Sequence, residues 1–256
     1  MGTRLLAALT RAESPLMLRD IAAEADLAPA QAHAYLASFR RIELVEQETG
    51  SGRYLLGPAA IKLAMARFRG SEVISAANRE AKTLSQDLGV MVAIVVWGPH
   101  APTVIVAHEA AAPLEINIRA GTRFSAIESA CGHVFAAFGN VHGVGDRAVA
   151  ELSAATENPT SLSNLKVAFQ NAIAQAREQG YSWLENKSRA GHQFCLGARF
   201  LGRDLELAIM LVGAGDRMRG GSDSEPISRL LSSVRVAEFG LSAASGESGK
   251  RGGRET

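Results

Sequence analysis

The sequence predicts an α+β protein of two domains: an N-terminal winged helix-turn-helix, and a larger C-terminal domain whose antiparallel or mixed sheet carries flanking helices. Three observations lead to this prediction. The chain has 256 residues, which is comfortable for two ordinary domains. The first 57 residues place three helical patterns before two short strand patterns. The remainder alternates apolar strand patterns with helical ones.

Composition excludes several classes of protein. Hydrophobic residues make up 47% of the chain, so a globally disordered protein is not expected. Two cysteines far apart in the sequence do not predict a disulfide framework. The sequence shows neither a signal peptide nor an apolar run near the roughly 20 residues of a membrane span, so we expect a soluble, cytoplasmic protein. The formal net charge of +1 neither demands nor excludes nucleic acid.

The N-terminal elements follow the order of a helix-turn-helix. Residues 4–12 and 19–25 place apolar side chains at helical spacing, and 26–28 form a tight connection. Pro29 stands where a first helical turn accepts proline, so we expect a third helix over 29–41. Two helices joined by so short a turn match the helix-turn-helix arrangement.

A hairpin follows directly. Residues 44–48 and 53–56 have strand patterns on either side of a glycine-containing turn. A hairpin placed there is a wing, and the whole order is more specific than a helix-turn-helix alone. We therefore predict a DNA-binding domain over residues 1–57, followed by a helical linker over 58–88 that Gly70 interrupts.

The second domain is expected over residues 89–242. Its first strand pattern, 90–97, is nearly continuous in apolar residues, which is typical of a strand covered on both faces. A polar loop over 153–163 precedes a long helix that ends at Gln179. Further strands are predicted over 103–108, 114–119, 181–185, 194–200 and 205–212, further helices over 129–138 and 225–242, and a disordered tail over 243–256.

Several segments together resemble the IclR family of bacterial regulators. They are residues 18–22 (LRDIA), 29–36 (PAQAHAYL), 52–57 (GRYLLG), 124–138 (FSAIESACGHVFAAF) and 179–181 (QGY). The similarity covers about residues 4–242. It implies a GAF-like effector domain, a homodimer or dimer of dimers, and a palindromic double-stranded DNA operator. The function implied is a DNA-binding transcription regulator, with repression as the working expectation, and not an enzyme.

The sequence also departs from the family's pattern. Gln31, Ala32 and Ala34 stand where the family's recognition helix usually carries Ser, Thr and Arg, and Leu55 stands where its wing often carries a basic residue. We therefore expect an unusual operator. The alternative function is a ligand-binding or interaction module whose winged helix no longer reads DNA.

Six side chains of the N-terminal domain are candidates for DNA contact. A recognition helix reads base edges in the major groove through its first residues, and the amide of Gln31 suits adenine. His33 and Tyr35 reach base edges or phosphate, although Tyr35 could equally pack inside the domain. The basic candidates are Arg19, Arg40 near the DNA backbone at the end of the third helix, and Arg53 at the wing tip; Arg19 and Arg53 could also be ordinary solvated arginines.

The effector site is expected at the start of the 129–138 helix. The first amides of a helix have no intrahelical partner and attract an anion, so a small organic acid suits this position. Ser129 adds a hydroxyl, with plain helix capping as its alternative. The other candidates are Ala130 and Gly132, which admit a ligand to the backbone; Cys131, which could equally be a buried small side chain; Trp97 and Phe124 as apolar walls; and His192 and Cys195, which the resemblance places around the cavity.

Two further chemistries were weighed against this interpretation. Cys131, His133, His192 and Cys195 could hold zinc if their loops converged, but side chains two residues apart on a helix point apart. A cysteine hydrolase would use one of the two thiols, and no local signature supports it. We therefore predict no metal and no cofactor.

Overall fold

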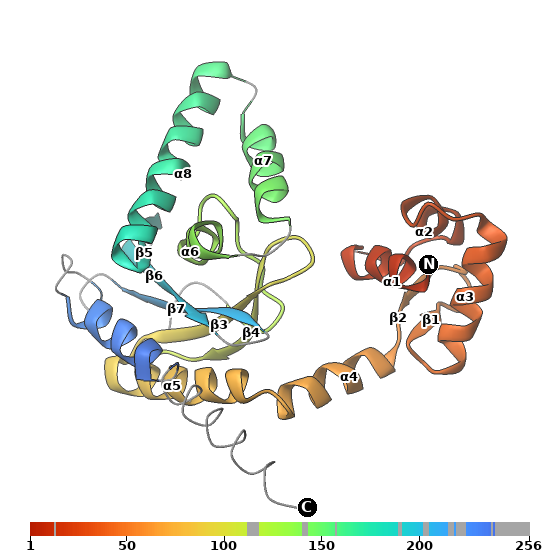
Figure 1. Cartoon of the computed structure of the whole chain (residues 1–256), viewed down its shortest axis with the longest axis horizontal. Helices are drawn as coiled ribbons and strands as arrows, with labels where there is room; N and C mark the ends of the chain where they lie inside the picture. The colour runs from red at the N-terminus through yellow and green to blue at the C-terminus, as the bar shows by residue number, and fades with distance from the viewer. Residues whose placement is uncertain are drawn as a thin grey trace, which may run out of the picture. The chain divides into compact units, whose positions relative to one another are not determined.

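The structure is a computed structural model of the whole chain (Figure 1). It separates into two compact units, Met1–Ser71 and Glu72–Thr256. The α+β class predicted from the sequence is confirmed. The boundary between the units falls after Ser71, inside the predicted linker 58–88 and next to Gly70, where the sequence predicts the domain boundary. The residues described are 1–12, 14–111, 118–139, 143–156, 158–188, 191–201, 205–214, 218, 224–236 and 238.

The first unit packs its first three helices against a hairpin, and a fourth helix follows the hairpin. Its core is apolar and fully enclosed: Leu5, Ile21 and Leu36, one from each of the first three helices, have no exposed surface. The two strands pair antiparallel, with Glu46 opposite Leu55. The elements are α1 (Gly2–Arg11), α2 (Leu18–Glu24), α3 (Pro29–Arg41), β1 (Val45–Gln47), β2 (Tyr54–Leu56) and α4 (Pro58–Arg69).

The hairpin is fixed to the segment that precedes α2. The backbone N–H of Tyr54 donates to the carbonyl of Leu16 at 2.7 Å, and the N–H of Leu16 donates back to Tyr54 at 3.0 Å. The Tyr54 side chain itself is buried in the core. These contacts hold the wing against the helix-turn-helix, so the first unit has the winged helix-turn-helix architecture that the sequence predicts.

The second unit is built on a five-stranded antiparallel sheet. Its strand order is β4-β3-β7-β6-β5, which leaves β4 and β5 at the edges. Residues 225–236 form a further helix. The other elements are α5 (Glu72–Leu88), β3 (Met91–Trp97), β4 (Pro102–His108), α6 (Ala130–Phe138), α7 (Val144–Ala155), α8 (Pro159–Gln179), β5 (Tyr181–Ser188), β6 (Gly191–Leu201) and β7 (Glu206–Ala214).

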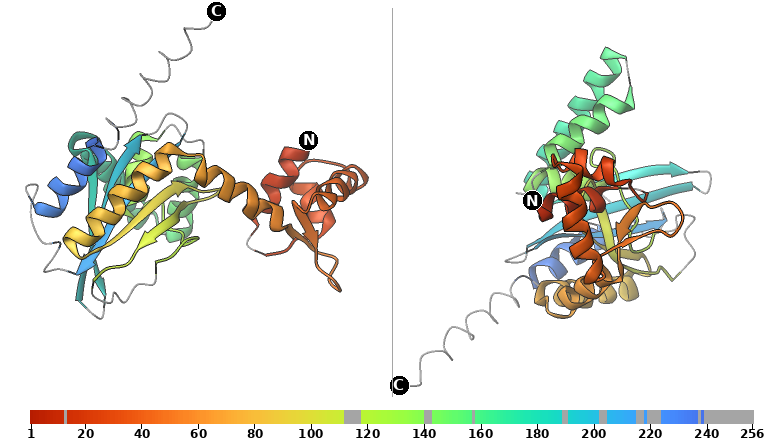
Figure 2. Two further views of the ribbon diagram at one scale, coloured as in Figure 1. Left: turned by 90° about the horizontal axis from the view of Figure 1, so that it is seen from below. Right: turned by 90° about the vertical axis from the view of Figure 1, so that its right-hand side faces the viewer.

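Helices cover both faces of this sheet (Figures 1 and 2). On one face, α5 and the 225–236 helix pack against strand residues that include Val92 and Ile94. On the other face, α6 packs against residues that include Met91 and Val95. Successive residues of β3 therefore enter different cores, which is why its sequence is apolar throughout. The predicted strand covered on both faces is confirmed.

The structure corrects the prediction of a polar loop over 153–163. Only residues 156–158 separate α7 from α8. Helix α8 begins directly after Asn158, which is its N-cap: the side-chain oxygen of Asn158 accepts from the N–H of Thr160 at 2.9 Å. The sequence analysis did not foresee α7, which buries Val144, Ala148 and Leu152 at four-residue spacing.

Some predicted segments fall outside the part of the chain that the structure describes. They are the tail over 243–256, most of the 114–119 strand and the end of the 225–242 helix. Among the described residues, no helix combines the length and the apolar character that crossing a bilayer requires.

Candidate nucleic-acid interface and ligand cavity

Helix α3 has one buried side and one exposed side. Ala32 and Leu36 are fully buried, whereas Gln31, His33 and Arg40 are exposed. Because Ala32 belongs to the core, its alanine cannot represent a lost DNA contact, and the sequence-based assignment of Ala32 to the groove face is wrong. Ala34 is exposed, and it remains the alanine at which this helix offers only a methyl group to a groove.

The remaining candidates for DNA contact also lie on the surface of the first unit. Tyr35 is 38% exposed and lies outside the buried core cluster, which argues against a purely structural role. Arg53 is exposed, and its guanidinium donates to the carbonyl of Pro15 at 3.1 Å. Arg19 extends into solvent beside Asp20, with 3.3 Å between its Nε and the carboxylate. The structure thus gathers Gln31, His33, Tyr35 and Arg40 on one helix, with Arg19 on α2 and Arg53 at the wing.

A cavity of about 570 Å³ lies in the second unit between α6, α8, the sheet and the segment 118–129. Its volume is typical of small-molecule sites, which are mostly apolar with a few polar groups. Its apolar lining includes Ile118, Phe124, Ile127, Leu165, Phe169 and Met210, and its polar lining is Ser125, Glu128, Ser129, His133 and Cys195.

The sequence comparison addresses the first unit. Residues 2–49 match the profile of the IclR helix-turn-helix domain. Residues 2–49 are thus similar to an IclR-type helix-turn-helix domain. A helix-turn-helix domain of this kind binds DNA, so the match supports the DNA-binding function predicted for the first unit. A search of curated protein sequences finds no match.

Solved structures share the fold of this chain over nearly its whole length. A putative IclR transcriptional regulator from Silicibacter has 17% sequence identity and a TM-score of 0.71, with 94% of each chain covered. An IclR family regulator from Brucella abortus has 16% identity and a TM-score of 0.67, covering 94% of this chain and 90% of its own. An IclR homologue from Microbacterium hydrocarbonoxydans, solved with 4-hydroxybenzoate, has 16% identity and a TM-score of 0.59, covering 94% and 98%. At sequence identities this low, the similarity shows a shared fold alone.

Ser129 is the N-cap of α6. Its hydroxyl oxygen accepts from the N–H of Gly132 at 3.0 Å, and its own proton is donated to the carbonyl of Ser125 at 2.5 Å. Its backbone carbonyl accepts from the N–H of His133 at 3.0 Å. Ser129 therefore caps α6, which is the alternative role that the sequence left open. It also lines the cavity.

The other residues predicted around the start of α6 do not all meet at the cavity. Phe124 and Cys195 line it, whereas Ala130, Cys131 and Gly132 are buried and Trp97 packs edge-on against Phe135. A Cβ on Gly132 would lie 2.6 Å from the Ser125 carbonyl oxygen. The glycine is therefore needed for the close packing of α6 against the loop through Ser125, and it does not admit a ligand to the backbone. The side chain of His192 lies outside the described residues; its backbone belongs to β6.

His133 is a cavity residue that the sequence analysis considered only as a zinc ligand. Its Nε2 lies 2.8 Å from the Ile127 carbonyl, which can only accept, so Nε2 carries the proton. Nδ1 then accepts from the Ser182 hydroxyl at 3.0 Å. Burial lowers the pKa of His133, against the opposing effect of the Ile127 carbonyl, and keeps the ring neutral. Its position four residues after Ser129, on the same helical face, is the signal that could have identified it.

Glu151 of α7 holds the rim of the cavity. Its Oε2 accepts from the Ser125 hydroxyl at 2.6 Å and from the Ala126 N–H at 2.8 Å, and its Oε1 accepts from Arg147 at 2.7 Å. Burial alone would raise the pKa of Glu151, but these hydrogen bonds outweigh it and hold the pKa below its ordinary value. Nothing in the local sequence connects Glu151 with a loop 25 residues earlier.

The two thiols are unsuited to nucleophilic chemistry. Burial raises the pKa of Cys131 to about 12 and that of Cys195 to about 11, so neither forms a thiolate at neutral pH. Within the described part of the chain, no group of three or more His, Cys, Asp or Glu side chains is placed to hold a metal ion.

Proposed function

We propose that this IclR-type chain is a transcription regulator that reads operator DNA through α3 and the wing and is controlled by a small organic acid in the 570 Å³ cavity. The observation that carries the DNA-reading part is the exposed side of α3. Ala32 and Leu36 are fully buried, while Gln31, His33 and Arg40 are exposed around the rest of the helix, beside a hairpin that carries Arg53. In DNA-binding proteins of this kind, such a helix usually contacts base edges, and contacts from elsewhere, such as a wing, bind the DNA backbone.

The effector class follows from the lining of the cavity. Aromatic and aliphatic side chains such as Phe124, Phe169 and Met210 suit an apolar body, and a few polar groups remain to orient it. The likeness in fold to a homologue solved with 4-hydroxybenzoate makes aromatic acids the first class to test. Control requires the acid to favour one arrangement of the two units over another, because a ligand with equal affinity for both shifts nothing.

A homodimer is part of this proposal. Helix α4 has no buried side chain, and Ile61, Leu63 and Met65 are 58% to 65% exposed. Ile61 and Met65, four residues apart, share one side of this helix and form an exposed apolar strip of the kind that soluble proteins usually cover, whereas Leu63 lies on another side. A second copy of α4 would cover it, and a two-fold dimer matches a palindromic operator, as a dimer of dimers also would.

The DNA part is tested by mobility shift on the DNA upstream of the protein's own coding sequence. Gln31→Ala should reduce discrimination between this DNA and a scrambled duplex, because Gln31 reads bases. Arg40→Ala should weaken binding to both duplexes and reduce the salt dependence, because Arg40 contacts phosphate. Lys166→Ala, an exposed cation on α8, is the matched control and should bind as wild type does. Unchanged binding by all three variants would refute the role of α3.

The effector part is tested by thermal shift with a panel of aromatic and aliphatic acids. A ligand of the native state raises the melting temperature by mass action. Ala172→Leu narrows the cavity and should abolish the shift, whereas Ala174→Leu, on the exposed side of the same helix, should retain it. An acid whose shift survives Ala172→Leu binds elsewhere, and this result would contradict the proposed site.

A further inference from the structure

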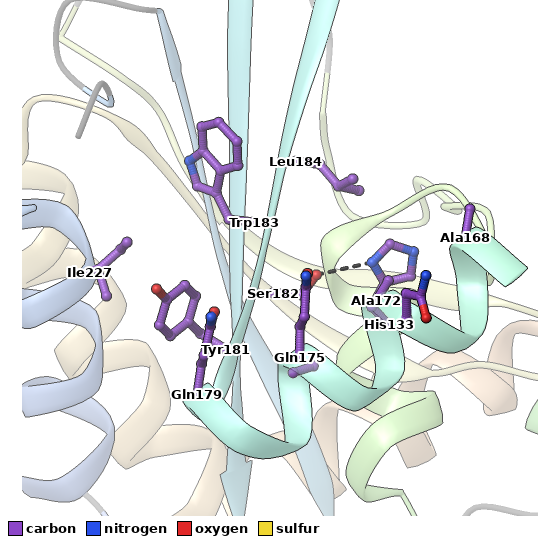
Figure 3. A pocket seen from close by; sticks show the side chains of 12 residues that line it. His133, Ala168, Ala172, Gln175, Gln179, Tyr181, Ser182, Trp183, Leu184 and Ile227 are labelled. Atoms are coloured by element: carbon purple, nitrogen blue, oxygen red, sulfur yellow. Dashed lines mark hydrogen bonds between the residues drawn. The ribbon is translucent and has the colours of Figure 1, made fainter. Parts of the chain in front are cut away.

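A second hollow, of about 430 Å³, lies between α8 and the edge strand β5 (Figure 3). Its α8 side presents the carboxamides of Asn171, Gln175 and Gln179, which are exposed and four residues apart. Its strand side presents Ser182, whose hydroxyl is hydrogen-bonded to His133. The outer hollow therefore places neutral hydrogen-bond donors beside apolar side chains such as Trp183 and Ile227, whereas the inner cavity is largely apolar.

The outer hollow and the inner cavity share a wall. His133, Ala168, Ala172 and Leu184 line both of them. Two of these four side chains are single methyl groups on successive turns of α8, so little material separates the two spaces. A ligand of sufficient length in the inner cavity could extend past this wall into the outer hollow.

The inner cavity is a poor place for a carboxylate. No lysine or arginine occurs among its described lining residues, while Glu128 adds a negative charge and His133 is neutral because burial lowers its pKa. A carboxylate held among the apolar side chains of this cavity would lose water without gaining a cationic partner, which costs far more than burial of an apolar group.

The N-terminus of α6 does not compensate for this. Ser129 already accepts from the N–H groups of Gly132 and His133. The earlier residues Ala130 and Cys131 have no exposed surface, and the backbone of Gly197 packs directly against them. The amides that usually attract an anion at a helix start are therefore bonded or covered.

We infer that the effector lies across both spaces, with its apolar body in the inner cavity and its carboxylate in the outer hollow against Gln175 and Asn171. There the anion stays hydrated and accepts hydrogen bonds from the carboxamides. The effector class is then an acid whose carboxylate is separated from the apolar body by a chain, in preference to a short aromatic acid. This inference rests on the proposed function, since it concerns the position of the same effector.

The first experiment is a length series measured by calorimetry on the full chain. The probes are benzoate, phenylacetate, 3-phenylpropanoate, 4-phenylbutanoate and 5-phenylpentanoate. Each buried methylene alone raises affinity about fourfold. We expect a larger step at the length at which the carboxylate passes the shared wall. A uniform increase, or the tightest binding by benzoate, would overturn the inference.

The second experiment changes the charge of the outer hollow. Gln175→Lys should tighten and Gln175→Glu should weaken the binding of 5-phenylpentanoate, each by roughly two- to fivefold, as for an exposed ion pair. The neutral 5-phenylpentanamide should not respond. Gln170→Lys and Gln170→Glu are the matched controls, because Gln170 is exposed on α8 and does not line the hollow.

The outcomes separate this inference from the proposed function. If the acids bind and stabilise the protein but charge at residue 175 has no effect, or acts equally on the acid and its amide, the carboxylate lies elsewhere. The inference then fails while the effector site stands. If no acid of any length binds, the effector part of the proposed function fails, and the inference fails with it.

Discussion

Replacement of Gly132 by alanine tests how α6 is seated above the cavity. An added Cβ would lie 2.6 Å from the carbonyl oxygen of Ser125 and still closer to that of Ala126. Both obstacles are backbone atoms, and they cannot move aside freely. The hydrogen bonds from the Ser125 hydroxyl and the Ala126 N–H to Glu151 fix this loop, and the Ser129 cap fixes the helix.

The magnitude follows from two opposing effects. Overpacking of a well-packed site costs about 1–3 kcal/mol. Alanine returns up to about 1 kcal/mol through its better helix propensity. A net loss of about 1–2 kcal/mol is expected, and a domain of this size loses about 2–4 °C of melting temperature per kcal/mol. Gly132→Ala should therefore melt about 2–8 °C below the wild type.

The assay is thermal unfolding followed by circular dichroism, with Gly145→Ala as the control. Gly145 lies in α7 with no atom within 4 Å of an added Cβ, so alanine there should leave the melting temperature unchanged or slightly higher. The expected signs for the two glycines are thus opposite. A Gly132→Ala protein at least as stable as wild type would refute the seating of α6 described above.

Three further predictions concern both units. Leu36→Ala removes a fully buried side chain of α3 and should destabilise the first unit by about 2–5 kcal/mol in urea titration; a smaller loss than that of an exposed Tyr35→Ala variant would contradict the assigned core. Ser129→Ala should cost about 1 kcal/mol through loss of the α6 cap, and Ser129→Asp, which can also cap, should recover part of it. Because its folded-state pKa is lowered, Glu151 contributes stability that is present above the ordinary value of 4.5 and is lost as the pH falls through the lowered pKa. Urea unfolding at several pH values should therefore show a shallower acid loss for Glu151→Gln, and equal slopes would contradict the role of this carboxylate.

The elements that local patterns specify could be predicted from the sequence. The helix beginning at Pro29, the hairpin through Tyr54 and the strand over 90–97 each carry a period or a turn signal of their own. Helix α7 was missed because its buried positions are a sparse set, Val144, Ala148 and Leu152. The Asn-Pro pair at 158–159 was a readable helix start that the loop prediction overlooked.

The candidate site was less predictable because it depends on packing between distant segments. The motif around Ser129 drew attention to α6, whose Ser129 cap and His133 line the cavity. Its Ala130 and Gly132 nevertheless serve contacts with strand and loop backbone, which no spacing rule reveals. The wall that His133 forms with α8, and the carboxylate of Glu151 at the rim, join residues that are far apart in the chain. Chemistry of this kind becomes visible only when the fold brings the segments together.

The central claim is that the exposed side of α3 reads DNA. Fluorescence anisotropy with labelled upstream DNA tests it most directly when the wild type is compared, across a salt series, with a variant that carries Arg40→Glu and Arg41→Glu. Both arginines are exposed at the end of α3. The account predicts salt-dependent binding by the wild type and a loss of at least tenfold in the variant, since phosphate contacts are replaced by repulsion. Absence of wild-type binding at low salt, or equal binding by the two proteins, would contradict it.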